Sequence, residues 1–194
     1  RIYGLSFDRD GRLVTGCTDG FIRLYDEDFH LLTRRKLDAT QQLPMEVKFS
    51  PDGNEIAVGF FDSPSIAIIS ATDLSLLYSP DVDGLVKAKQ LNLITVTWSD
   101  NGEYLYAAGY YKGEDSKTSL YRWGEMGRGR REAIQVANHH IMAVRSMPGG
   151  LVTYASGEPS VGLLNKHGDT VWNNTADIGD FQRLVKNLSV SEDG

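Results

Sequence analysis

Apolar and polar residues alternate along this chain in short runs. The clearest run is Phe21-Ile22-Arg23-Leu24-Tyr25, and similar runs lie at residues 65–69, 119–123 and 160–164. An alternation with a period of two, rich in β-branched and aromatic residues, predicts strands with one buried face. No segment has a helical period of useful length, so the pattern argues against a parallel sheet covered by helices.

A second pattern precedes each alternating run: a short apolar strand enters a tight turn and another strand leaves it. The clearest copy is residues 47–59, around the turn Ser50-Pro51-Asp52-Gly53. Further copies lie at residues 5–16 and 96–109, a less regular one at 144–155, and the first part of another at 188–194. The glycines of these turns are Gly11, Gly53, Gly102, Gly150 and Gly194. Subtraction of their numbers gives spacings of 42, 49, 48 and 44 residues, a period that predicts a repeat architecture.

A fourth, less regular strand is expected in each repeat. These strands are expected near residues 30–37, 76–86, 132–136 and 168–172. Four short antiparallel strands per repeat are typical of a β-propeller blade. We therefore predict an all-β fold of about four blades in an incomplete ring. The expected blades are residues 1–42, 43–91, 92–138 and 139–185, with the start of a further blade at 186–194. Blades gain stability by stacking on neighbours, so the open faces of the end blades predict further blades or self-association.

The chain resembles the WD-repeat family. The turn Phe49-Ser50-Pro51-Asp52-Gly53 is typical of that family, and Tyr25-Asp26 stands where the family has its Trp-Asp dipeptide. The resemblance implies a rigid platform for protein partners. It also implies that Asp19 and Asp62, in the loops between second and third strands, tie down their own blades through hydrogen bonds. Gly-His pairs before the first strands are absent, and the other third strands lack the Trp-Asp ending.

Composition narrows the choice of partners. The chain has 194 residues, 41% hydrophobic and 24% charged, which is typical of a globular domain. A formal net charge of −6 argues against binding to nucleic acid or an acidic membrane surface. Cys17 is the only cysteine, which excludes an intrachain disulfide and fits a cytoplasmic protein. The sequence has no apolar run of membrane-spanning length, and its start, without methionine, suggests a piece of a longer protein.

Aromatic residues are the first candidates for partner contacts. The pairs Phe60-Phe61 and Tyr110-Tyr111 end second strands near the loops that the resemblance assigns to the binding face. Exposed aromatic side chains often anchor protein interfaces. The alternative is burial between blades, since neighbouring residues on a strand face opposite sides. We predict partner contacts by Phe61, Tyr110 and Tyr111.

The second candidate is the basic segment 127–131, in which Arg128, Arg130 and Arg131 could grip a carboxylate or phosphate group. Its alternative is an ordinary solvated loop.

His139-His140 is the sole histidine pair, and no carboxylate or thiol stands beside it at a metal-ligand spacing, so we predict no metal site. No nucleophile elbow, metalloprotease helix or phosphate-binding glycine loop is present. We predict no cofactor and no enzyme activity.

The repeats and the missing catalytic motifs favour one function above others. We predict a non-catalytic propeller scaffold that mediates protein–protein interaction, as the sensor or recruitment region of a larger multidomain protein. The alternative is the non-catalytic propeller portion of an enzyme, either a hydrolase-gating domain or a quinoprotein-like propeller that binds a small molecule. A third interpretation is a structural spacer.

Overall fold

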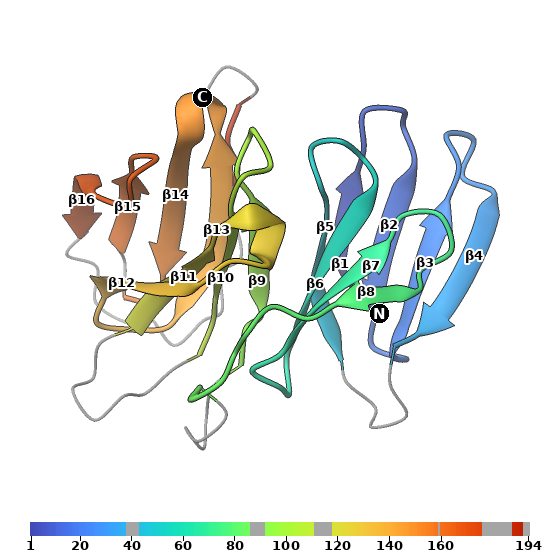
Figure 1. Ribbon diagram of the computed structural model, residues 1–194, viewed down its shortest axis with the longest axis horizontal. Helices are drawn as coiled ribbons and strands as arrows, with labels where there is room; N and C mark the ends of the chain where they lie inside the picture. The colour runs from blue at the N-terminus through green and yellow to red at the C-terminus, as the bar shows by residue number, and fades with distance from the viewer. Residues whose placement is uncertain (38–42, 86–91, 111–117, 159, 176–187, 192–194) are drawn as a thin grey trace.

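Four sheets, each with four antiparallel strands in chain order, make up the described part of the computed structural model (Figure 1). The structure describes residues 1–37, 43–85, 92–110, 118–158, 160–175 and 188–191. Blade 1 contains β1 (Ile2–Phe7), β2 (Leu13–Cys17), β3 (Phe21–Tyr25) and β4 (Leu31–Lys36). Blade 2 contains β5 (Pro44–Phe49), β6 (Glu55–Phe60), β7 (Ile66–Ser70) and β8 (Leu76–Tyr78).

The second pair of sheets repeats this arrangement. Blade 3 contains β9 (Thr95–Trp98), β10 (Leu105–Ala108), β11 (Thr118–Trp123) and β12 (Arg131–Ala137). Blade 4 contains β13 (Ile141–Met147), β14 (Leu151–Ser156), β15 (Ser160–Leu164) and β16 (Thr170–Thr175). Two single 3-10 turns, Glu125–Gly127 and Pro148–Gly150, are the helical elements of the described residues. The predicted all-β fold of four-stranded propeller blades is therefore confirmed.

The turns between first and second strands explain why the repeat is visible in the sequence. Gly11, Gly53 and Gly102 have φ of 81°, 73° and 75°, a region that side chains with a Cβ atom rarely adopt. In the second blade, the Ser50 hydroxyl donates to Asp52 Oδ1 at 2.5 Å and accepts from the Glu55 amide at 2.9 Å. The turn is thus closed by its own side chains, and the two flanking strands are held in register.

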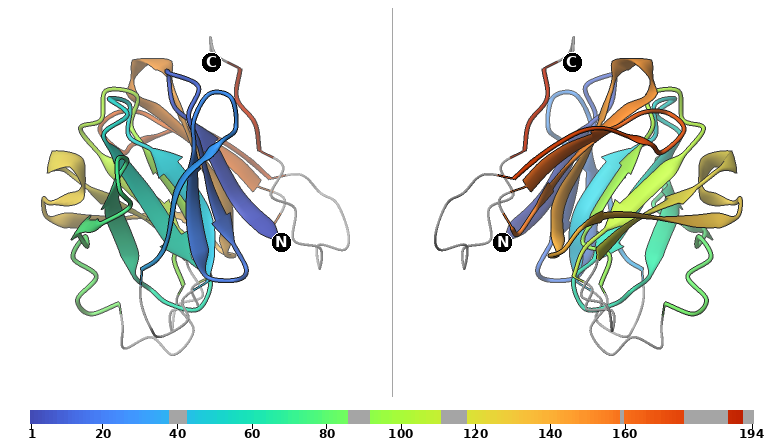
Figure 2. Two further views of the ribbon diagram at one scale, coloured as in Figure 1. Left: turned by 90° about the vertical axis from the view of Figure 1, so that its right-hand side faces the viewer. Right: turned by 90° about the vertical axis from the view of Figure 1, so that its left-hand side faces the viewer.

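Successive blades pack face to face. β1 and β2 pack on β5, β5 and β6 pack on β9, and β9 and β10 pack on β13. A separate apolar core fills each of the three junctions. Among the described elements, extensive contacts do not join blade 4 to blade 1, and these two blades form opposite ends of the arc (Figures 1 and 2). Within the described residues, the arc therefore has one uncovered blade face at each end.

Two details differ from the expected strand pattern. The fourth strand of blade 2 ends at Tyr78, whereas we expected it to extend as far as residue 86. Pro80 follows closely, and proline lacks the amide hydrogen needed to continue a ladder. Residues 188–191 adopt no strand. The exact blade boundaries, and a further blade starting at 186–194, stay predictions.

Candidate functional site

An aromatic row crosses blades 2, 3 and 4 at the end where each blade is linked to the next. Phe61 follows β6 and is 44% exposed, while its neighbour Phe60 is buried because adjacent residues of an extended chain face opposite sides. Tyr110 follows β10 and stacks on the ring of His140, which precedes β13, with 4.5 Å between centroids. We call Phe61, Tyr110 and His140 the aromatic row.

Asn92 joins the first two members of the aromatic row. Its side-chain amide donates to the Phe61 carbonyl at 2.5 Å, and its side-chain carbonyl accepts from the Tyr110 amide at 3.0 Å. The Asn92 backbone amide also donates to the Tyr110 carbonyl at 3.1 Å. Three backbone groups of the row, the Phe61 carbonyl and the amide and carbonyl of Tyr110, are thereby satisfied within the chain. The backbones carrying Phe61 and Tyr110 are held together as a result.

An apolar floor lies under Tyr110. Met45, Ile94 and Met142 form a small buried cluster, and Tyr110 packs against it. The three residues precede or begin the innermost strands of blades 2, 3 and 4, so the same repeat position supplies each of them. Methionine adapts its shape to whatever it contacts. The row therefore combines an exposed aromatic edge with a deformable apolar base, which suits contact with a protein surface.

His140 is neutral in the folded chain at ordinary pH. Burial lowers the pKa of His140 from 6.5 to about 4, and the nearby His139 ring adds to the shift. The folded state disfavours the charged imidazolium, whereas the unfolded chain takes up a proton once the pH falls below about 6.5. Acidification between pH 6.5 and pH 4 therefore favours unfolding through this group.

We expect the unfolding free energy of the wild type to fall more steeply between pH 6.5 and pH 4 than that of His140→Phe. The phenylalanine keeps a ring against Tyr110 and removes the titrating nitrogen. Urea denaturation at several pH values across this window measures the two slopes. The variant His167→Phe, in which an exposed residue on the β15–β16 turn changes, controls for the loss of a histidine. Equal slopes in the wild type and His140→Phe would contradict the expectation.

The two predicted structural aspartates make hydrogen bonds inside the chain. Asp19 accepts from the Phe21 amide at 3.0 Å and forms an ion pair with Arg23 at 2.6 Å. The Arg23 hydrogen bond lowers the pKa of Asp19 to about 2. Asp62 accepts from the Leu43 amide at 3.1 Å, which ties the loop after β6 to the segment before β5. Each carboxylate thus supports its own blade.

The arginines of the basic segment differ in their surroundings. Arg128 pairs with Glu55 of blade 2 at 2.9 Å, and its guanidinium lies 3.8 Å from the ring centroid of Tyr78. Arg131 donates to the carbonyls of Asp81 and Asp83. Arg130 is exposed. Arg128 and Arg131 therefore join blade 3 to blade 2. Tyr111 lies outside the described residues.

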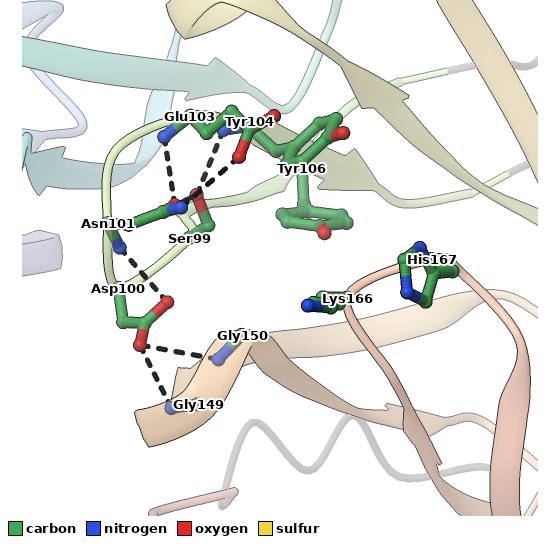
Figure 3. Close-up of a pocket in the computed structure, with 10 residues that line it drawn as sticks. All are labelled: Ser99, Asp100, Asn101, Glu103, Tyr104, Tyr106, Gly149, Gly150, Lys166 and His167. Atoms are coloured by element: carbon green, nitrogen blue, oxygen red, sulfur yellow. Dashed lines mark hydrogen bonds between the residues drawn. The ribbon is translucent and has the colours of Figure 1, made fainter.

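A pocket of about 330 Å³ lies at the opposite end of blades 3 and 4 (Figure 3). The rings of Tyr104 and Tyr106 face Lys166 and His167 across it. One side is closed by Asp100, whose carboxylate accepts from the amides of Gly149 and Gly150 at 3.0 and 3.3 Å. The Arg122 guanidinium donates to the carbonyls of Lys166 and His167, which fixes the facing turn.

Sequence reasoning missed Asn92, this pocket and a charged pair at the centre of the arc. Glu46 on β5 pairs with Arg145 on β13 at 2.9 Å and also accepts from the Val96 amide. These residues are far apart in sequence, so only the stacking of the blades brings them together. The one local signal was the repeat itself, which places Glu46 and Arg145 on innermost strands. Among the described residues, no group of three or more His, Cys, Asp or Glu residues is placed to hold a metal ion.

Comparison with known proteins adds one finding. Residues 1–26 match the family model described as WD domain, G-beta repeat, and these residues form the first three strands of blade 1. No curated protein matches the chain.

No helix of the described residues is long and apolar enough to cross a membrane. WD-repeat domains typically are non-catalytic and generally bind protein partners. The match in blade 1 and the four successive four-stranded blades support a WD-repeat-like β-propeller.

Proposed function

We propose that this chain is a non-catalytic scaffold that binds a protein partner through the aromatic row and the loops beside it. The observation that carries the proposal is the pairing of an exposed Phe61 with a Tyr110 held in place by Asn92. Rigid aromatic side chains on a fixed backbone lose little conformational entropy on binding, so they make efficient anchors. Tyr111 follows directly in the sequence, and we propose a partner contact for it as well.

We also propose a cytoplasmic location for the protein and a partner contact by the basic segment. A single buried cysteine supports a cytoplasmic, reducing environment. Arg128 and Arg130 are both exposed, but Arg130 makes no ion pair among the described residues, so it is the arginine of the basic segment best placed to contact a partner. The ion pair of Arg128 and the carbonyl contacts of Arg131 support a structural role for these two residues at the junction of blades 2 and 3. We propose the sensor or recruitment region of a larger protein as the setting in which this scaffold acts.

We expect the double variant Phe61→Ala/Tyr110→Ala to lose about tenfold or more of its partner capture, the effect of removing interface anchors. Partner proteins captured by the immobilised chain from an extract of the source cells would be quantified by mass spectrometry. Leu76→Ala is the matched control, because Leu76 is also exposed but lies on the outer strand of blade 2. Circular dichroism would show that both variants stay folded. Capture that survives the double substitution would overturn the proposed surface.

A small-molecule function is the second candidate, and the pocket between blades 3 and 4 favours it. Its volume lies near the lower end of the range of ligand sites, and Lys166 and His167 offer polar contacts beside two tyrosine rings. This candidate corresponds to the propeller portion of an enzyme that binds a small molecule. Partner capture that depends on the aromatic row would argue for the scaffold instead, because the row and the pocket lie at opposite ends of the blades.

A further inference from the structure

The outward face of blade 1 carries several exposed apolar side chains at one end of the sheet. Leu5 and Phe7 on β1 are 55% and 52% exposed, and Phe29 in the β3–β4 turn is 61% exposed. The Phe7 and Phe29 rings touch edge to face, with 6.3 Å between centroids. Leu31 of β4 is exposed beside them and pairs with Tyr25. We call Leu5, Phe7, Phe29 and Leu31 the open face of blade 1.

The same repeat positions are buried in the next two blades. Counting back from the turn glycine, Leu5 corresponds to Val47 and Val96, and Phe7 corresponds to Phe49 and Trp98. The cross-strand register supports this match, because Phe7 pairs with Leu13 as Phe49 pairs with Ile56. Val47, Phe49, Val96 and Trp98 are all buried under the preceding blade. A neighbouring blade is therefore what normally covers this face.

Phe29 independently indicates that a neighbouring blade normally covers this face. Phe29 and Leu74 occupy equivalent turns between third and fourth strands, and both hold a positive φ, 63° and 59°. A positive φ strains the backbone of any residue other than glycine, so each turn holds its apolar side chain in place at a cost in conformational energy. Leu74 is fully buried in the core between blades 1 and 2. Phe29 has the same backbone and no such cover in the described structure.

The covering surface also has a recognisable pattern. The face that a blade presents to its successor carries a small residue on the second strand: Gly16 in blade 1, Gly59 in blade 2 and Ala108 in blade 3. Two aliphatic residues on the third strand accompany it in the first two blades. These pairs are Ile22 with Leu24 and Ile66 with Ile68.

Blade 4 carries the same pattern on its far face. Ala155 occupies the small position on β14, and Val161 and Leu163 occupy the two aliphatic positions on β15. All three are partly exposed, unlike their equivalents at the junctions between blades. The chain therefore presents one face that needs a preceding blade and another face built like those that precede a blade.

We propose that the open face of blade 1 binds the far face of blade 4 of a second copy of this chain. The contact is heterologous, so it joins two different patches in head-to-tail order. Two copies that close on each other would contain eight blades, which is within the usual range of four to eight for propellers. The interaction rests on the fold and not on the proposed partner surface, because the aromatic row lies on blades 2, 3 and 4.

Sedimentation equilibrium of the chain over the micromolar range tests the association. We expect the apparent mass to rise towards that of a dimer with concentration. Phe7→Glu and Ala155→Arg should each give a monomer, since each places a charge in one half of the contact. Leu76→Glu is the control and should behave as the wild type, because Leu76 is as exposed as Leu5 but lies on the outer strand β8.

A mixture of the two disrupted chains distinguishes head-to-tail contact from other kinds of dimer. Phe7→Glu keeps an intact blade 4 face and Ala155→Arg keeps an intact blade 1 face, so an equimolar mixture should regain part of the dimer. Circular dichroism of each variant alone would establish that it is folded. A wild type that stays monomeric at all concentrations would overturn the proposal. So would an Ala155→Arg chain that dimerises as the wild type, because this result would mean that like faces pair.

Discussion

Trp123→Ala is expected to lower the unfolding free energy by about 3–5 kcal/mol, the cost of emptying a large buried aromatic site. Trp123 ends β11 and is fully buried in the core between blades 2 and 3. Its indole Nε1 also donates to the Asp81 carbonyl at 2.9 Å, which ties the segment after β8 to blade 3. The substitution thus removes apolar contact and a hydrogen bond at one junction.

Urea denaturation followed by far-ultraviolet circular dichroism measures the effect on Trp123→Ala. Leu77→Ala is the matched control, because Leu77 lies on β8 close in sequence to the same linker and is largely exposed. Its stability should stay within about 0.5 kcal/mol of the wild type. A loss below about 1 kcal/mol for Trp123→Ala would mean that the junction between blades 2 and 3 contributes little to folding.

Gly59→Ala is expected to cost about 1–3 kcal/mol or more, the usual range for forcing extra atoms into a packed site. Gly59 lies on β6 where the backbone of the next blade approaches closely. A Cβ atom built there would lie 2.5 Å from the Leu93 carbonyl oxygen and 3.1 Å from a Val96 methyl group. The clash is with backbone, so a change of side-chain rotamer cannot relieve it. The two blades have to move apart instead.

The same denaturation experiment tests Gly59→Ala, with Gly124→Ala as the control. A Cβ atom at Gly124 would meet only the Tyr104 ring, at an ordinary contact distance of 3.8 Å. We expect Gly124→Ala to have the stability of the wild type within about 0.5 kcal/mol. Equal stability of Gly59→Ala and the wild type would show that the junction adapts to an added methyl group at no cost.

The aromatic row illustrates the limit of local sequence reasoning. Alternation along β6 correctly indicates that Phe60 and Phe61 face opposite sides, because side-chain direction in a strand depends only on position. The stack of Tyr110 on His140 has no such local signal, since these residues come from different blades. Asn92, which holds the row together, lies in a linker where the sequence shows no repeat. The surface that we propose for binding is therefore a product of blade stacking.

The basic segment shows a related limit. Its charge predicts a solvated loop or an anion site, and both interpretations treat the arginines as one group. The structure separates them, because Arg128 contacts Glu55 and Tyr78 of the preceding blade, whereas Arg130 makes no ion pair among the described residues. Charge is visible in a sequence, but the partner of each charge depends on which strands become neighbours. Glu46 and Arg145, two blades apart, show the same dependence.

The sequence by itself determined the all-β class, the four-stranded repeat and the turns at Gly11, Gly53 and Gly102. These features follow from the alternation of side chains along a strand and from the positive φ of each turn, which are properties of neighbouring residues. The tertiary structure alone decided which faces are covered, and it left Leu5, Phe7 and Phe29 open while burying their equivalents. Burial depends on the neighbour across the junction between blades, and no local pattern contains that neighbour.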